Sequence, residues 1–111
     1  MSMNYRVKLT NYAIEQLQEI VFYISKVLLS PDTAQSWSDK IMEELYSLDD
    51  LPSRYKLVEE EPWHSFGVHK MVIQNFIAYY WIDETNTTVW ITGVIYEKQN
   101  QVAALRRMPM I

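Results

Sequence analysis

The segment that decides the fold is Val72-Ile73-Gln74-Asn75-Phe76-Ile77-Ala78-Tyr79-Tyr80, in which a polar dipeptide separates two apolar runs. β-Branched and aromatic residues dominate both runs, as is typical of strands. Two polar residues between such runs indicate a β-hairpin. A third run follows a second polar segment, so the expected strands are Val68–Ile73, Phe76–Ile82 and Thr88–Tyr96. The second half of the chain is therefore predicted to form a three-stranded antiparallel meander.

The first half of the chain has a different periodicity. Residues 4–9 alternate between apolar and charged or polar side chains, which predicts a half-buried strand. Apolar residues then recur at spacings of three and four, which places them on one face of each of two helices. Thr10 or Asn11 can cap the first helix, and Ser30 followed by Pro31 can start the second. The predicted apolar stripes are Ala13, Leu17, Ile20, Val21, Ile24 and Leu28 in the first helix and Ala34, Trp37, Ile41, Leu45 and Leu48 in the second.

Together these elements predict an α+β fold with the order β-α-α-β-β-β, in one domain that spans residues 1–111. An antiparallel sheet would pack one of its faces on the helical hairpin, because each element must bury its apolar side. The tail around Gln99–Arg107 is compatible with a short C-terminal helix.

The composition excludes several kinds of site. The chain has two glycines, Gly67 and Gly93, which are too few for a glycine-rich phosphate loop. It has no cysteine, which excludes a disulfide, a thiolate metal site and a cysteine nucleophile. Its apolar runs are far shorter than the ~20 residues that span a bilayer. We therefore expect a cytoplasmic protein with no cofactor, no metal and no membrane contact.

Charge is distributed unevenly along the chain. The formal net charge is −4, which argues against a general affinity for nucleic acid phosphates. All fourteen acidic residues lie in residues 1–97 with seven of the ten basic ones, so this part carries about −7. The tail has three cations, Lys98, Arg106 and Arg107, and no acid. A basic tail on an acidic body indicates a specific contact with a partner.

Five stretches occur in a fixed order along nearly the whole chain. They are Tyr5-Arg6-Val7-Lys8-Leu9-Thr10 with Ala13, Leu29-Ser30-Pro31-Asp32-Thr33-Ala34, Leu51-Pro52-Ser53-Arg54, Val72–Tyr80 and Val89–Tyr96. In this order and spacing they resemble the RelE/ParE superfamily of bacterial toxins, and the ParE-like branch more closely. The resemblance implies the toxin component of a type II toxin–antitoxin system, neutralised by a helical antitoxin that wraps around it.

The resemblance implies two alternative activities. Some members dock in the ribosome and cut messenger RNA, whereas others inhibit DNA gyrase and are not nucleases. Cutting members usually carry an arginine after the aromatic residue of the central strand, where this chain has Ile77. They place His, Arg or Tyr at the end of the last strand, where Tyr96 and Lys98 are available here. A nuclease would therefore depend on a reduced catalytic set of Tyr96, Lys98, His69 and Lys70.

Each of the two histidines also has an interpretation that involves no catalytic role. His69 can be a partly exposed strand residue, and His64 lies in a loop beside Pro62. Since RNA cleavage needs cations that stabilise the phosphorane, the missing arginine favours a toxin that is not a nuclease.

The central strand of the meander offers a candidate surface for a protein partner. By strand parity, Ile77, Tyr79 and Trp81 share one face, and Trp90 on the neighbouring strand can join them. Both faces of this strand are apolar, although the helical hairpin can cover only one. Either the tail covers the second face, or this face is open and binds a partner through its aromatic side chains.

Two further partner-binding surfaces are expected outside the sheet. On the helical wheel Phe22 lies opposite the core stripe of the first helix and forms a small apolar patch with Leu29. Arg106 and Arg107 provide a basic contact on the tail. These surfaces favour a toxin that binds a protein target such as DNA gyrase. The alternatives are a ribosome-dependent mRNA endoribonuclease and a non-toxic relative that only binds partners. The cognate antitoxin is the other expected partner, and the expected assembly is either a homodimer or a toxin–antitoxin heterotetramer.

Overall fold

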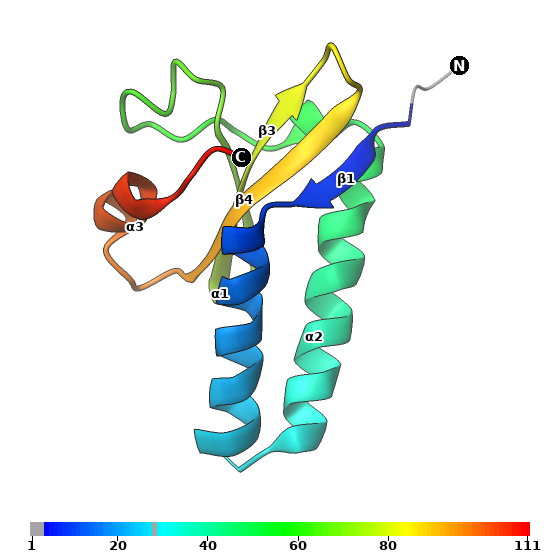
Figure 1. Cartoon of the computed structure of the whole chain (residues 1–111), viewed down its shortest axis with the longest axis vertical. Helices are drawn as coiled ribbons and strands as arrows, with labels where there is room; N and C mark the ends of the chain where they lie inside the picture. Colours follow the sequence, from blue (N-terminus) through cyan, green and yellow to red (C-terminus); the bar gives the residue numbers. More distant parts are fainter. Residues whose placement is uncertain (1–3, 28) are drawn as a thin grey trace.

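The computed structural model describes residues 4–27 and 29–111, so Leu28 of the first predicted stripe lies outside the described residues. A pair of long helices packs against a sheet, and a short helix follows the last strand (Figure 1). The helices and strands are β1 (Arg6–Leu9), α1 (Asn11–Phe22), α2 (Pro31–Tyr46), β2 (His69–Ile73), β3 (Phe76–Asp83), β4 (Thr88–Tyr96) and α3 (Gln101–Arg107). This order confirms the predicted α+β fold and the short C-terminal helix.

The strands within the described residues form one sheet in the order β1-β4-β3-β2. β2, β3 and β4 form the predicted antiparallel meander, and Ile73 pairs with Phe76 across the first turn. β1 lies at the edge and runs parallel to β4, with Val7 opposite Val89. A parallel neighbour needs a long crossover connection, which the hairpin of α1 and α2 helps to supply. The sheet is therefore mixed, a detail that the alternation of residues 4–9 does not reveal.

The two long helices begin where the sequence predicts, at Asn11 and Pro31. The Thr10 hydroxyl accepts a hydrogen bond from the Ala13 N–H at 3.1 Å, so Thr10 is the cap of α1. Pro31 is the first residue of α2, as expected. Ser30 occupies the capping position, but its hydroxyl donates to Thr33 Oγ1 at 2.6 Å and makes no capping bond to the backbone. The helical path beyond α1 is a five-residue π-helix, Tyr23–Val27, which the sequence did not predict.

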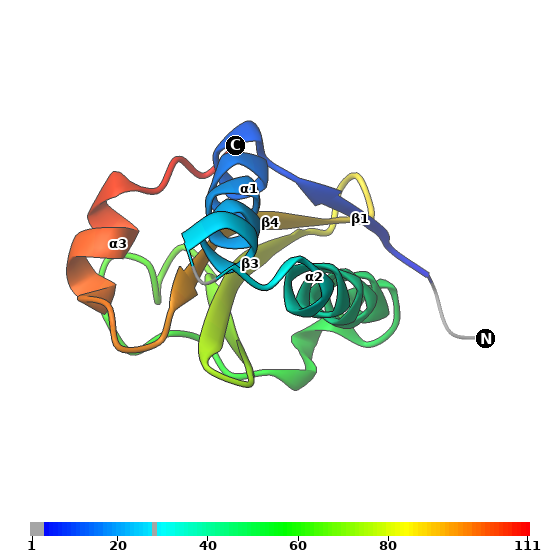
Figure 2. The same cartoon turned by 90° about the horizontal axis from the view of Figure 1, so that it is seen from below.

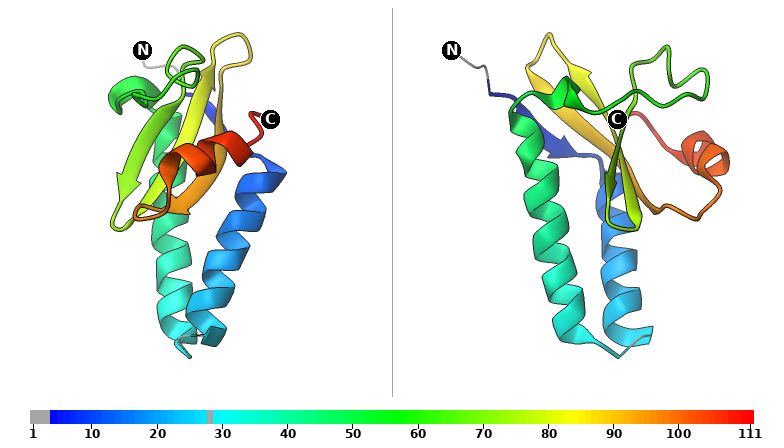
Figure 3. Two further views of the ribbon diagram at one scale, coloured as in Figure 1. Left: turned by 90° about the vertical axis from the view of Figure 1, so that its left-hand side faces the viewer. Right: turned by 180° about the vertical axis from the view of Figure 1, so that it is seen from behind.

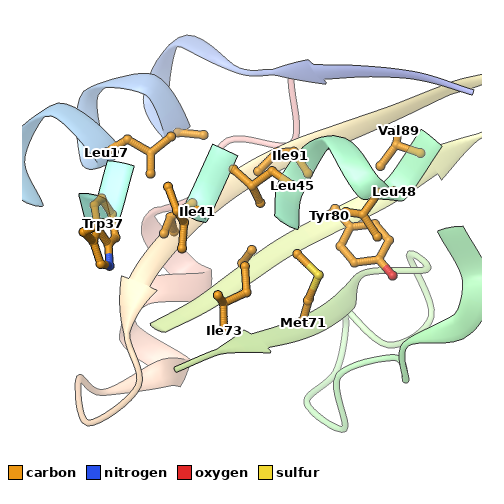
Figure 4. Close-up of a cluster of buried hydrophobic side chains, with 13 residues drawn as sticks. Leu17, Trp37, Ile41, Leu45, Leu48, Met71, Ile73, Tyr80, Val89 and Ile91 are labelled. Carbon is orange, nitrogen blue, oxygen red and sulfur yellow. The ribbon is translucent and has the colours of Figure 1, made fainter. Parts of the chain in front are cut away.

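The main core lies between the hairpin and the sheet (Figure 4). Predicted stripe residues of both helices face the inward side chains of the strands. Its buried members are Ala13, Leu17, Trp37, Ile41, Leu45, Leu48, Met71, Ile73, Ala78, Tyr80, Val89, Ile91 and Val94. At ~25 cal/mol per Å² of apolar area removed from water, such burial is the main source of stability for a chain of this size.

The opposite face of the sheet carries a second core. α3 lies on the side of the sheet away from the hairpin (Figure 3), and Val58 and Val68 of the segment before β2 pack there with it. The buried residues of this second core are Val58, Val68, Ile77, Tyr79, Ile95, Ala104, Leu105 and Met108. Both faces of β3 are therefore covered, which explains why its sequence is apolar on both sides. Within the described part of the chain, no helix is long and apolar enough to span a bilayer.

Candidate partner-binding surfaces

The sheet face that was a candidate for an open partner surface is closed. Ile77 and Tyr79 are 2% and 1% exposed, and α3 packs over them in the second core. Of the two interpretations of this face, the structure shows the covered one, and the expectation of an exposed surface at Ile77 and Tyr79 is corrected. The physical reason is the tail, which supplies Ala104, Leu105 and Met108 as apolar cover.

The residues after α3 are held in place by bonds to the sheet. The Trp81 indole N–H donates to the carbonyl oxygen of Met110 at 2.8 Å, and the Met108 sulfur lies 3.2 Å from the Thr92 hydroxyl. Gly93 makes room for this contact, because a Cβ there would lie 2.8 Å from the Met108 sulfur. Trp81 is thus half-buried beneath the tail. Trp90 is also half-buried and has the Lys8 ammonium 5.8 Å from its ring centroid.

Tyr79 carries a buried hydroxyl inside the second core. Among the described residues this hydroxyl finds no hydrogen-bond partner. Burial, with a smaller contribution from the negative charge of Glu60, raises the pKa of Tyr79 to about 12. The side chain is therefore neutral at physiological pH. Its ring packs in the second core, and its hydroxyl has no hydrogen bond among the described residues. It is not placed to act as a proton donor to a ligand outside the core.

The four residues of the candidate nuclease site are not brought together. His69 pairs with Tyr80 and Tyr96 pairs with Phe76, so they lie four residues apart along β3, which corresponds to ~13 Å. Lys70 points to the other face of the sheet, where its ammonium donates to Gln101 Oε1 at 3.3 Å. Lys98 is exposed in the turn after β4.

His69 already has structural contacts. Its Nδ1 lies 2.8 Å from the Tyr55 carbonyl oxygen, which makes Nδ1 the protonated donor, and its ring stacks on Tyr80 with centroids 4.9 Å apart. His64 likewise places Nδ1 2.8 Å from the carbonyl oxygen of Val58. Both histidines thus hold the segment before β2 in place through hydrogen bonds to its carbonyl oxygens. In the described part of the chain, no group of three potential metal ligands is found.

The tip of the hairpin carries several exposed apolar side chains. It projects beyond the sheet, so no strand covers it (Figure 1). Phe22 and Leu29 are 62% and 82% exposed, as the helical wheel predicted. Tyr23 and Val27 are also more than half exposed, which the sequence did not predict. They belong to the π-helix, whose wider turn shifts side chains away from the positions that a 3.6-residue period assigns.

A groove runs along the outer side of the hairpin, between α1 and α2. We call it the hairpin groove; its volume is about 620 Å³, and Leu9, Ile14, Leu17, Val21, Phe22 and Met42 supply its apolar lining. Arg106 and Arg107 lie elsewhere, exposed at the end of α3. The predicted partner residues are thus distributed over separate surfaces.

Comparison with known protein families assigns the chain. The model of the family described as "ParE toxin of type II toxin-antitoxin system, parDE" matches residues 7–101. The chain belongs to the ParE toxin family. The matched region of this ParE-family toxin extends from β1 to the start of α3 and includes the sheet and both long helices. Comparison with curated protein sequences gives no significant match.

Solved structures of toxin–antitoxin proteins share this fold. A chain of the chromosomal ParDE system from P. aeruginosa superimposes with a TM-score of 0.69 at 20% identity, covering 86% of this chain and 98% of that one. A chain of the RelBE2 toxin–antitoxin complex from Mycobacterium tuberculosis gives 0.60 at 23% identity, covering 84% and 98%. A mutant of the E. coli toxin RelE in the free state gives 0.52 at 14% identity, covering 95% and 98%.

The matched region includes the Leu51-Pro52-Ser53-Arg54 stretch at the end of the second helix. In this ParE-family toxin, Arg54 donates from Nη1 to the carbonyl oxygens of Ser47 and Leu51, both at 3.3 Å, and from Nη2 to the Ser47 hydroxyl at 2.9 Å. The Ser47 carbonyl belongs to the end of α2, where backbone carbonyls have no partner within the helix. Arg54 therefore stabilises the exit from α2, with its donors engaged by two backbone carbonyls and by the Ser47 hydroxyl.

Proposed function

We propose that this ParE-family toxin arrests growth by binding a protein target, with DNA gyrase as the first candidate, and not by cutting RNA. The observation that carries the proposal is the second core. At the position where cutting relatives carry an arginine, Ile77 is buried among apolar side chains beneath α3. A phosphate would have to enter this core without a cation to pair with, and burying an unpaired charge is strongly unfavourable.

We further propose a cognate antitoxin as the neutralising partner and the cytoplasm as the place of action. The family assignment supports a type II toxin–antitoxin pair. The exposed apolar tip at Phe22 and Leu29, the hairpin groove and the cations Arg106 and Arg107 are the surfaces available for protein contacts. Aromatic and arginine side chains are common anchors of such interfaces.

The experiment is induction of the chain in bacteria without its antitoxin. Messenger RNA integrity and plasmid supercoiling are followed from the first minutes. We expect growth arrest with intact transcripts and a loss of negative supercoiling. The same result is expected for a Tyr96→Phe/Lys98→Ala double variant, because these side chains have no catalytic role in this proposal. Rapid cutting of transcripts in the ribosomal A site, abolished in the double variant, would contradict the proposal and establish the nuclease. Normal growth would also contradict the proposal and would support a non-toxic relative that only binds partners.

A further inference from the structure

A cavity of about 600 Å³ lies between the end of α1 and the strand ends beside the turn that joins β2 to β3. Glu19 and Tyr23 line it from the helix. Phe76 and Tyr96, which pair across β3 and β4, line it from the sheet. We call it the aromatic cavity. It shares no lining residue with the hairpin groove, so the two are separate surfaces.

Phe76 presents a ring that its neighbours hold in place. The centroid of this ring lies 4.8 Å from that of Trp37, at an interplanar angle of 60°, and 5.7 Å from that of Tyr96, at 69°. Tilted and edge-on contacts of this kind are favourable between aromatic rings. Phe76 is half-buried, and part of its surface lines the cavity. A bound group would therefore meet a preorganised ring, and little side-chain freedom would be lost on binding.

Tyr23 provides a second ring, at the start of the π-helix. Its side chain is 53% exposed, and its N–H is bonded to the carbonyl oxygens of both Glu19 and Ile20. Wide helical turns of this kind are frequent at functional sites. Residues four apart on a helix are neighbours on the same side, so the Glu19 carboxylate lies next to the Tyr23 ring. An acid and an exposed ring are thus adjacent at the cavity.

The charge of the cavity is negative. Among the described residues that line it, Glu19 is the charged one. Glu15, exposed one turn earlier on the same side of α1, adds a second negative charge, and like charges at this spacing slightly destabilise a helix. The tail cations Lys98, Arg106 and Arg107 do not line the cavity. Figure 2, which views the molecule from below, shows α3 well to the side of α1 and of the yellow-green turn between β2 and β3. A cation bound here would therefore relieve a local excess of negative charge.

The chemistry of the cavity selects one kind of side chain. Aromatic faces attract cations, which a guanidinium or an ammonium group can supply. A guanidinium is planar, so it stacks on a ring and also pairs with a carboxylate through two hydrogen bonds, whereas an ammonium is a strongly hydrated point charge. Glu19 would repel a phosphate, and an apolar side chain would cover its carboxylate without a partner. Arginine fits both the rings and the acid.

We propose that the aromatic cavity binds an arginine side chain of the toxin's protein target, with the guanidinium stacked on Tyr23 and Phe76 and paired with the Glu19 carboxylate. This inference rests on the proposed function, in which the chain acts by binding a protein, and it names the chemistry that the target presents. Tyr96 supports the Phe76 ring with its own ring, which the Tyr96→Phe change of the induction experiment keeps.

The first test is an NMR titration of the full chain with the peptide acetyl-Gly-Arg-Gly-amide. Its control carries citrulline, which has nearly the same shape without the charge. We expect saturable shifts of the Tyr23 and Phe76 ring resonances, with affinity about fivefold or more weaker for the citrulline peptide and for Glu19→Gln. Equal affinities for the two peptides, or shifts confined to other surfaces, would overturn the inference. So would a short oligonucleotide that shifts these rings where the arginine peptide does not, because it would assign the cavity to nucleobases.

The second test connects the cavity to the target through the supercoiling activity of purified DNA gyrase. Glu19→Arg and Tyr23→Ser should raise the half-inhibiting concentration of the chain about tenfold, as loss of an interface anchor does. Glu43→Arg and Tyr46→Ser are matched controls on α2, since Glu43 is exposed and Tyr46 is 50% exposed, and they should inhibit normally. Thermal unfolding verifies that all four variants fold.

The outcomes separate this inference from the proposed function. Inhibition by the unsubstituted chain, with equal potency for the test and control variants, would overturn the inference alone. Undiminished supercoiling in the presence of the unsubstituted chain would overturn the proposed function and the inference with it.

Discussion

Tyr79 and Tyr80 are neighbours on β3 whose hydroxyls have opposite surroundings. Tyr80 donates to the carbonyl oxygen of Pro52 at 2.6 Å, whereas the Tyr79 hydroxyl is buried without a partner among the described residues. Tyr80→Phe should lower the free energy of unfolding by about 1–3 kcal/mol, because it leaves a buried carbonyl unsatisfied. Tyr79→Phe should leave this free energy unchanged or raise it. Urea unfolding of both variants measures the difference. Equal destabilisation by the two changes would contradict this account of the two hydroxyls.

The buried Tyr79 hydroxyl should also make the free energy of unfolding depend on pH in the alkaline range. Burial raises the pKa of Tyr79 to about 12, compared with 10.0 for an exposed tyrosine. Below pH 10 both states keep the proton, so there is no effect. Between pH 10 and pH 12 the unfolded chain loses the proton and the folded chain keeps it, so stability falls as pH rises. At pH 11 the loss should be roughly 1.4 kcal/mol. Urea unfolding at pH 8 and pH 11 should show a smaller decrease for Tyr79→Phe than for the unsubstituted chain.

At the scale of elements, Gly93 lies where β4 is in close contact with α1 and with the tail. The register of β3 and β4 shifts here, from Tyr79 opposite Gly93 to Tyr80 opposite Ile91. A Cβ at Gly93 would lie 2.8 Å from the Met108 sulfur and 3.2 Å from Gln16 Oε1, which itself accepts the Val94 N–H at 2.8 Å. The close approach on β4 thus requires glycine.

Gly93→Ala should therefore lower the free energy of unfolding by about 1–3 kcal/mol, the usual cost of overpacking. Because the nearest atom belongs to a flexible side chain, Met108→Ala in the same chain should remove part of this cost. A double-mutant cycle by thermal or urea unfolding measures the coupling. Strict additivity would show that the Met108 contact is not the source of the strain.

The sequence located the helices and strands, but it did not show which of them lie side by side in the fold. Alternation and helical spacing located the strands and the helices, because each pattern reports which side of an element is buried. They did not place β1 beside β4, since the order of strands depends on contacts between distant residues. They also left open what covers Ile77 and Tyr79, because burial on both faces looks the same whichever segment provides the cover. The sequence also did not predict the π-helix that carries the exposed residues Tyr23 and Val27, because a 3.6-residue period has no signature for it.

At the scale of the molecule, the hairpin carries the apolar surface that the sheet does not bury. Phe22 lines the hairpin groove and is 62% exposed, and Leu29 at the tip is 82% exposed and outside that lining. Phe22→Ser should change the free energy of unfolding by no more than about 0.5 kcal/mol, as is usual for exposed positions. It should weaken antitoxin binding, whereas Leu29→Ser should bind normally. Calorimetric titration and unfolding curves check both parts. Equal loss of binding in both variants would place the contact at the tip and not in the groove.

At this scale, the proposal that toxicity works through protein binding rests on the apolar face of the sheet that α3 closes over Ile77 and Tyr79. The most direct measurement is supercoiling of a relaxed plasmid by purified DNA gyrase in the presence of the purified chain. The expected result is a dose-dependent loss of supercoiling that the antitoxin reverses, while messenger RNA on translating ribosomes stays intact under the same concentrations of the chain. Undiminished supercoiling, together with cleavage of the ribosome-bound messenger RNA, would contradict it.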